Sequence, residues 1–137
     1  MKGRCEIRVR YVDTDQMGVV YYGRYLEWFE VGRTEYLRQM GWPYAKMEEE
    51  GIFLPVIEAY VSYVRPARYD EWISVWTTLE LPQRARIKLV YQVMRGDTLL
   101  ASGYTVHAFM DNKGRPIRPP RALMERLRAC SSVEGDA

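Results

Sequence analysis

Histidine is almost absent from this sequence of 137 residues, which contains one histidine and two cysteines. Nucleophilic catalysis of the Ser-His-Asp or Cys-His type needs a histidine, and the only one, His107, falls within a predicted strand. No GxSxG turn accompanies any serine. We therefore disfavour a catalytic triad and predict a structural role for His107, because an isolated histidine in a strand more often packs or hydrogen-bonds than catalyses.

Long apolar runs are absent as well. No segment approaches the ~20 consecutive apolar residues that cross a bilayer. The sequence begins Met1-Lys2-Gly3-Arg4, without the hydrophobic core of a signal peptide. We therefore expect a cytoplasmic protein with no membrane span.

Cysteine is too scarce for a metal centre. Cys5 and Cys130 lie near opposite ends of the chain, and neither belongs to a CxxC motif or a His-rich cluster. We expect two reduced thiols, with a disulfide between them as the lesser alternative in a reducing compartment. Glycine-rich phosphate cradles are also missing, which argues against nucleotide hydrolysis. The sequence thus predicts no metal site.

Charge of one sign is not in excess. The sequence has 20 Lys and Arg and 18 Asp and Glu, so the net charge is +2. Nucleic-acid binding usually requires basic residues concentrated on one face, whereas here they alternate with acids, so we expect no nucleic-acid partner. Residues 84–95 and 113–121 are locally basic, which suits a phosphorylated small molecule or, as the alternative, a solvated strand edge and loop.

Apolar residues, in contrast, are abundant. They make up 47% of the chain, which is enough for the core of one domain. No internal repeat, low-complexity run or change in composition marks a boundary. We predict a single domain over residues 1–130 and a disordered tail over residues 131–137.

The spacing of the apolar residues predicts the secondary structure. Period-two alternation with β-branched and aromatic residues is typical of strands, whereas spacings of three, four and seven are typical of helices. We expect strands at 6–12, 54–64, 72–81, 86–95 and 99–110, and helices at 22–40, 43–50 and 121–128. Gly41 is expected to end the long helix in a left-handed conformation, and Gly96-Asp97 to turn a hairpin whose two strands pair.

One long helix and five strands predict an α+β domain in which the helix lies on a single antiparallel sheet. Gly32 within the helix either permits a close backbone approach or is a tolerated surface glycine. A sheet flanked by one helix leaves an open edge. We therefore expect a homodimer that joins two sheets.

Two aspartates, Asp13 and Asp15, stand in the loop just before the long helix. The first amides of a helix are unpaired donors that carry partial positive charge. The amide of Tyr22 or Gly23 would polarise a thioester carbonyl, while an aspartate attacks the carbon or activates water. The residues alone leave open the alternative that Asp-x-Asp serves capping and turn formation.

The run YVDTDQMGVVYYGRYL at residues 11–26 resembles the signature of the 4-hydroxybenzoyl-CoA thioesterase family, in particular its YbgC-like acyl-CoA thioesterase branch. The resemblance continues through FEVGRTEYL at residues 29–37 and YVRPARYDE at residues 63–71, and it covers most of residues 6–127. It implies a hot dog fold, in which a five-stranded antiparallel sheet wraps a long central helix. It also implies hydrolysis of an acyl-CoA to a free acid and CoA.

Carried over by position, the resemblance implies that Asp15 is the catalytic carboxylate, as nucleophile or general base, and that Asp13 shapes the loop. The backbone amide of Tyr22 would donate to the thioester carbonyl. YbgC-like members typically have histidine at this position, whereas this sequence has tyrosine, so no role is assigned to the side chain. No cofactor is expected, because water and acyl-CoA suffice.

The resemblance also implies that CoA lies across a subunit interface of a homodimer or homotetramer. Its phosphates would lie near Arg65 and Arg68, for which a surface ion pair with Asp70 or Glu71 is the alternative. The alternative function is a non-catalytic acyl-CoA-binding module, since a fold alone does not establish chemistry.

Two further expectations concern the helix and the acyl group. Glu30 and Arg33 lie one turn apart and are expected to pair. A dehydratase is disfavoured, because it needs a histidine beside a carboxylate, and His107 lies in a late strand. A set of apolar residues either lines an acyl tunnel or belongs to the core: Met17, Val19, Val20, Tyr21, Phe53 and Val56.

Overall fold

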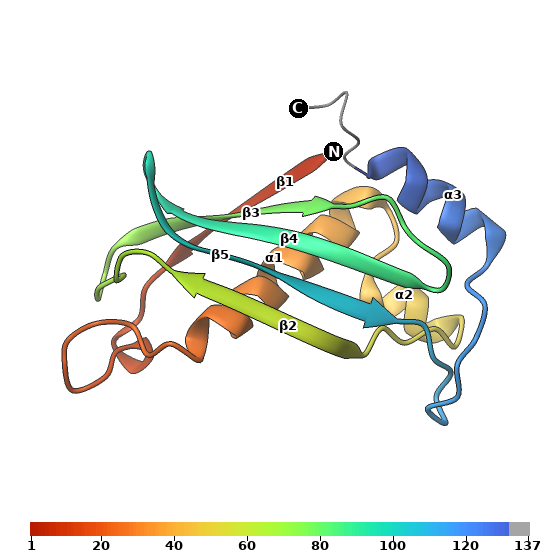
Figure 1. The fold of residues 1–137 in the computed structure, drawn as a ribbon, viewed down its shortest axis with the longest axis horizontal. Helices are drawn as coiled ribbons and strands as arrows, with labels where there is room; N and C mark the ends of the chain where they lie inside the picture. The colour runs from red at the N-terminus through yellow and green to blue at the C-terminus, as the bar shows by residue number, and fades with distance from the viewer. Residues whose placement is uncertain (132–137) are drawn as a thin grey trace.

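Residues 1–131, which the computed structural model describes, form a five-stranded antiparallel sheet that curves around one long helix (Figure 1). The strand order is β1-β3-β4-β5-β2, and every neighbouring pair is antiparallel. The strands are β1 (Lys2–Arg8), β2 (Val56–Tyr63), β3 (Trp72–Leu79), β4 (Arg86–Arg95) and β5 (Thr98–Ala108). The predicted α+β architecture is confirmed.

The long helix α1 (Arg24–Met40) buries one face against the sheet, as its apolar spacing requires. It ends at Gly41, whose φ of 93° is the predicted left-handed conformation and whose amide donates to the carbonyls of Leu37 and Arg38. A Cβ on Gly32 would lie 2.8 Å from Val75 Cγ1, so this glycine does permit the close approach of α1 to β3.

The sheet centre is equally close to the helix. The ring of Phe29 stacks on Tyr91, with centroids 4.3 Å apart and planes 8° from parallel. Beside them, a Cβ on Gly103 would lie 2.8 Å from the Phe29 ring and 2.1 Å from the carbonyl oxygen of Tyr60. Because residue 103 is a glycine, β5 can pack closely against both α1 and β2.

Two short helices complete the described chain. Helix α2 (Tyr44–Glu49) follows α1, and α3 (Arg121–Cys130) buries Leu123, Met124 and Leu127. The tail predicted to be disordered lies outside the described residues, except for Ser131, which is buried and donates through Oγ to the carbonyl of Arg128. None of the helices in residues 1–131 has the length and apolarity to cross a membrane.

The first predicted strand was wrong in its bounds. Strand β1 pairs with β3 only as far as Arg8↔Trp72, and a 3-10 turn follows at Tyr11–Asp13. The Asp13 carboxylate explains the change, because its Oδ2 accepts the Arg10 amide at 2.8 Å and bends the chain out of the ladder. The hairpin at residues 96–97 and the pairing of its two strands are confirmed.

Candidate active site

The loop between Asp13 and α1 projects from one end of the molecule, where Figure 1 draws it in orange-red. It is closed by hydrogen bonds from the Asp15 amide to the Val19 carbonyl (2.9 Å) and from the Gly18 amide to the Asp15 carbonyl (3.0 Å). Gly18 has a φ of 78°, which a side chain would disfavour. Short polar residues and a glycine thus build a defined turn rather than an open strand.

The Asp15 side chain is exposed on this turn. Its Oδ1 accepts the Met17 amide at 2.8 Å, which fixes the carboxylate relative to the backbone. Its Oδ2 receives no hydrogen bond from any residue between 1 and 131. One oxygen of the carboxylate is therefore hydrogen-bonded to the turn, and the other has no partner in the described chain.

Asp13 supports the loop from below and is only 2% exposed. Its Oδ1 lies 3.7 Å from Nε of Arg24, and its carbonyl accepts the Tyr21 amide at 2.8 Å. These contacts tie both ends of the loop to the start of α1. They are the contacts of a loop-shaping residue, as expected.

The backbone just before α1 carries two free donors. The amide of Arg24 donates to the Tyr21 carbonyl at 3.0 Å, and that of Tyr25 to the Tyr22 carbonyl at 3.3 Å. The amides of Tyr22 and Gly23 find no acceptor in the described part of the chain. They are the unpaired amides that a helix start offers to an oxyanion.

A small cavity of about 260 Å³ adjoins Tyr22. It is lined by Val20, Tyr22, Tyr25, Tyr63, Val64, Arg65 and Pro66. The Tyr63 hydroxyl donates to the Tyr22 carbonyl at 2.9 Å. Residues 63–66 come from the end of β2 and the segment after it, so the fold adds a second chain segment to the loop.

Arg65 and Arg68 both lie beside the loop. Arg65 lines the small cavity, and the backbone of Arg68 forms a bridge with Val19. Their alternative ion pairs are absent from residues 1–131, because Asp70 pairs with Arg8 and Glu71 with Arg95. Asp15, Tyr22 and both arginines therefore gather at one end of the molecule.

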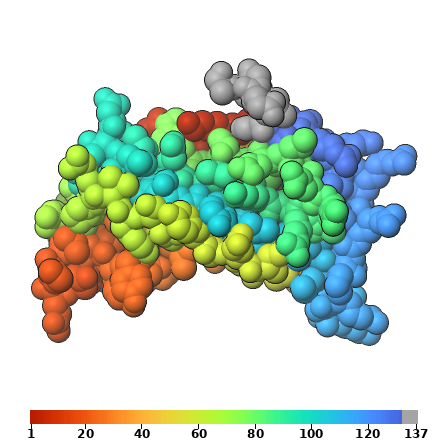
Figure 2. Space-filling view, viewed as in Figure 1, coloured from red at the N-terminus to blue at the C-terminus, as the bar shows by residue number. Residues whose placement is uncertain are grey.

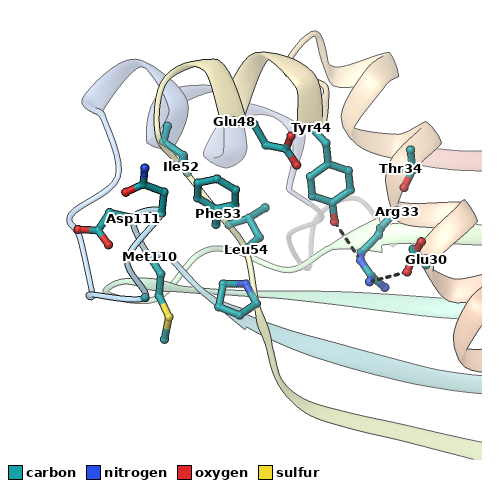
Figure 3. A pocket seen from close by; sticks show the side chains of 13 residues that line it. Glu30, Arg33, Thr34, Tyr44, Glu48, Ile52, Phe53, Leu54, Met110 and Asp111 are labelled. Carbon is teal, nitrogen blue, oxygen red and sulfur yellow. Dashed lines mark hydrogen bonds and ion pairs between the residues drawn. The ribbon is translucent and has the colours of Figure 1, made fainter.

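A larger cavity of about 590 Å³ lies at the other end, between α1, α2 and the loops around residues 53 and 111 (Figure 3). Its polar wall is Arg33, which is 9% exposed and donates through Nε to the Tyr44 hydroxyl at 3.0 Å. Arg33 Nη2 also lies 3.9 Å from Glu30 Oε2, which confirms the predicted pair. Phe53 lines this cavity, whereas Met17 lies exposed on the loop. The apolar residues that were considered as one acyl tunnel therefore lie in separate parts of the structure.

His107 is fully buried in the sheet, where it contacts Leu54, a residue that lines the larger cavity. Its Nδ1 donates to the Leu54 carbonyl at 3.0 Å, so its Nε2 accepts from the Thr105 hydroxyl at 2.8 Å. The Thr105 oxygen in turn accepts from Tyr91, 2.6 Å away. Burial lowers the pKa of His107 to about 4. The predicted structural role of His107 is confirmed.

Cys5 and Cys130 are both free thiols. Burial, followed by the charge of Glu35, raises the pKa of the Cys5 thiol, which keeps it protonated and unreactive. Within residues 1–131, no cluster of three or more His, Cys, Asp or Glu side chains could hold a metal ion.

A long helix wrapped by a curved five-stranded sheet, with a carboxylate loop at the helix start, defines the hot dog thioesterase-like class of proteins. A family model described as the thioesterase-like superfamily matches residues 9–127, and the chain belongs to this family. The resemblance seen in the loop motif is thereby confirmed.

Individual proteins are similar to this chain over most of its length. The acyl-CoA thioesterase YbgC of Haemophilus influenzae is 33% identical over 119 residues, which cover 85% of this chain and 88% of that protein. The crystal structure of the hypothetical protein TT1821 from Thermus thermophilus is 34% identical, with a TM-score of 0.91 over 97% of this chain and 100% of that chain. The DHNA-CoA thioesterase structure from Staphylococcus aureus is 36% identical, with a TM-score of 0.81 over 85% of this chain and 80% of that chain.

Proposed function

We propose that this protein is an acyl-CoA thioesterase, which hydrolyses the thioester bond of an acyl-CoA to a free acid and CoA. The observation that carries the proposal is the junction of loop and helix. There, the free Oδ2 of Asp15 and the unpaired amides of Tyr22 and Gly23 belong to one short segment. The relatives named as acyl-CoA thioesterases support the same activity.

The thioester carbonyl oxygen would accept a hydrogen bond from the Tyr22 or Gly23 amide, which stabilises the negative charge that develops on it. Asp15 then acts in one of two ways. As nucleophile, it bonds to the carbonyl carbon and expels the CoA thiolate, and water hydrolyses the resulting anhydride to the acid. As general base, it takes a proton from a water that attacks the carbon, and the tetrahedral intermediate expels the thiolate. In both routes the thiolate is protonated and Asp15 is restored.

Tyr22 contributes its backbone to this chemistry. Its side chain is exposed and packs on the ring of Tyr21, with centroids 4.4 Å apart. An amide donor needs no particular side chain, so tyrosine in place of the histidine typical of YbgC-like proteins is compatible with the role. Neither route requires a metal or another cofactor.

We assign the phosphates of CoA to Arg65 and Arg68, which lie beside the loop and whose guanidinium groups have no acid partner in the described chain. Arginine suits this role because its planar donors match phosphate oxygens. An acyl-CoA substrate also supports the expected cytoplasmic location.

Thiol release from short, long and aromatic acyl-CoAs tests the function directly. We expect hydrolysis of at least one class at a rate well above that of the buffer blank, and the panel reports the acyl preference. If the protein binds acyl-CoA, as measured by calorimetry, but never releases thiol, the acyl-CoA-binding module replaces the enzyme.

We also propose a homodimer that pairs β2 with its copy. Strand β2 is an edge of the sheet, and Figure 2 shows it recessed between two projecting segments. Its large side chains are exposed: Val56, Ile57, Tyr60 and Tyr63. A free apolar edge is the usual site of sheet extension, whereas the opposite edge, β1, carries charged residues.

Antiparallel pairing about a twofold axis would bring the Tyr63 end of one β2 beside the Val56 end of the other. The Arg33 cavity of one copy would then face the Asp15 end of its partner.

Ile57→Lys is expected to give a monomer at concentrations where the wild type is a dimer, because a charge would be buried in the interface. Light scattering coupled to gel filtration measures the mass. Val31→Lys on α1 is the matched control, since Val31 and Ile57 are both 43% exposed. A dimer that survives Ile57→Lys contradicts the β2 interface, and a tetramer that Val31→Lys reduces to a dimer would place a second interface on α1.

A further inference from the structure

Arg33 is a buried cation whose hydrogen-bond donors are only partly used. It lies on α1, is 9% exposed and lines the cavity of about 590 Å³ (Figure 3). A guanidinium has five N–H donors. Nε donates to the Tyr44 hydroxyl at 3.0 Å, and the Tyr91 hydroxyl also interacts with the group. Both partners are neutral, so the remaining donors can bind an acceptor in the cavity.

The acids around the cavity do not neutralise this cation closely. Glu30 lies 3.9 Å from Nη2 of Arg33, beyond hydrogen-bond distance, and its side chain is 69% exposed. Asp111 accepts from the side chain of Arg115, and Glu48 is exposed. Water screens exposed carboxylates, so they interact only weakly with a buried charge. An anion bound inside the cavity would be the close partner that a buried guanidinium requires.

The rest of the cavity wall suits a hydrocarbon chain. It contains five apolar residues: Ile52, Phe53, Leu54, Pro55 and Met110. The volume of about 590 Å³ lies in the range of small-molecule sites. The planar guanidinium forms paired hydrogen bonds with a carboxylate. A ligand with an apolar body and a carboxylate at one end would therefore match both parts of the cavity.

The β2 dimer proposed above brings this cavity to the catalytic loop of the other copy. Within one copy, Arg33 and Asp15 lie toward opposite ends of the molecule, so they cannot serve one substrate there. In the dimer, the cavity faces the Asp15 end of the partner. An acyl group held by its thioester at one copy's Asp15 would extend into the cavity of the other copy.

We propose that Arg33 determines substrate specificity, by binding the terminal carboxylate of a dicarboxylic acyl-CoA whose thioester is cleaved at Asp15 of the partner subunit. This inference rests on the proposed thioesterase function and on the β2 dimer. It names the acyl class as an apolar chain with a carboxylate at its far end. Hydrolysis of such a substrate by water releases a dicarboxylic acid and CoA.

Matched substrates test the role of Arg33, since adipyl-CoA and hexanoyl-CoA have acyl chains of equal length, as do suberyl-CoA and octanoyl-CoA. We expect a higher kcat/KM for the dicarboxylic member of at least one pair. Arg33→Gln should lower that kcat/KM about 10- to 100-fold, the effect of losing a charged hydrogen bond, and leave the neutral substrate within about threefold. Arg38→Gln is the matched control, because Arg38 is an exposed arginine of the same helix that pairs with Glu35. It should keep the wild-type preference.

Two results would overturn the role of Arg33. One is a kcat/KM of the wild type that is no higher for the dicarboxylic member of either pair. The other is a preference that survives Arg33→Gln. Retained hydrolysis of the neutral substrate verifies that this variant folds, and Arg33→Lys, which keeps the charge but loses the planar donors, should weaken the preference as well. If the wild type releases no thiol from any acyl-CoA, the thioesterase is refuted, whereas calorimetry still reports whether adipyl-CoA binds more tightly than hexanoyl-CoA.

A hybrid dimer tests whether the two residues act across the interface. Chains with Asp15→Asn and chains with Arg33→Gln carry different tags, are co-expressed and are purified through both tags. If Arg33 serves the partner's Asp15, one of the two sites in the hybrid keeps both wild-type residues, and hydrolysis of the dicarboxylic substrate should reach about half the wild-type rate. A rate no higher than that of the Arg33→Gln dimer would contradict action across the interface.

Discussion

Asp15→Asn is expected to lower kcat for thiol release by about a thousandfold, the effect typical of removing a catalytic base or nucleophile. Asparagine has neither the charge to accept a proton nor the nucleophilicity to attack a carbonyl. Its side-chain oxygen can still accept the Met17 amide, so the turn that Asp15 Oδ1 holds at 2.8 Å is retained. Steady-state kinetics on the best acyl-CoA of the panel measures the effect.

The matched control is Asp97→Asn, an equally conservative change at the exposed hairpin turn, which should leave kcat unchanged. Circular dichroism and melting temperature verify that both variants fold. If Asp15→Asn retains wild-type activity, the catalytic carboxylate lies elsewhere.

Labelling with oxygen-18 water distinguishes the nucleophilic route from the general-base route, because a single turnover places the label in Asp15 only when Asp15 is the nucleophile.

The second large effect concerns stability in acid. His107 has a pKa of about 4 in the folded protein against 6.5 for the ordinary side chain, because burial disfavours the charged ring and Arg33 adds repulsion. Between these values the unfolded chain binds a proton that the folded chain does not. Stability is therefore fully present above pH 6.5 and is lost as the pH falls toward 4. Linkage gives a loss of about 2 kcal/mol at pH 5 and about 3 kcal/mol at pH 4 from this residue.

Urea unfolding at pH 7 and pH 5 measures this loss, with His107→Gln as the reference. Glutamine is polar and does not titrate, so the variant should lack the share of the acid sensitivity that comes from residue 107. The difference between the two proteins removes the contribution of the carboxylates, which also titrate in this range. Equal losses in the wild type and the variant would contradict the depressed pKa of His107.

The elements of the fold could be predicted because they depend on neighbouring residues. The apolar spacing of α1 and the alternation of β3 to β5 are local patterns, and each led to the observed element within a few residues. The prediction failed at residues 9–12, where alternation continues but the Asp13 carboxylate captures the Arg10 amide. There, one side-chain contact outweighed a backbone preference.

The candidate site could be predicted only in part. Asp15 and Tyr22 belong to one continuous motif, so their proximity follows from the chain itself. The Arg33 cavity was missed, although the Glu30–Arg33 pair was expected, because its other walls come from α2 and two loops. The hydrogen bond from Tyr63 to the Tyr22 carbonyl was also missed, since the two residues lie 41 positions apart.

The sequence by itself thus determined the class of fold, the carboxylate loop and the helix that follows it, since each of these is encoded by a continuous stretch of residues. Only the tertiary structure decided which backbone groups form hydrogen bonds and which have no partner. The bond from Tyr63 to the Tyr22 carbonyl exists because strand order places β2 at the sheet edge beside the start of α1. The contact of His107 with Leu54 likewise depends on how β5 meets the segment before β2. Such contacts join residues far apart in the chain, and their formation depends on the packing of the sheet around the helix rather than on any local pattern.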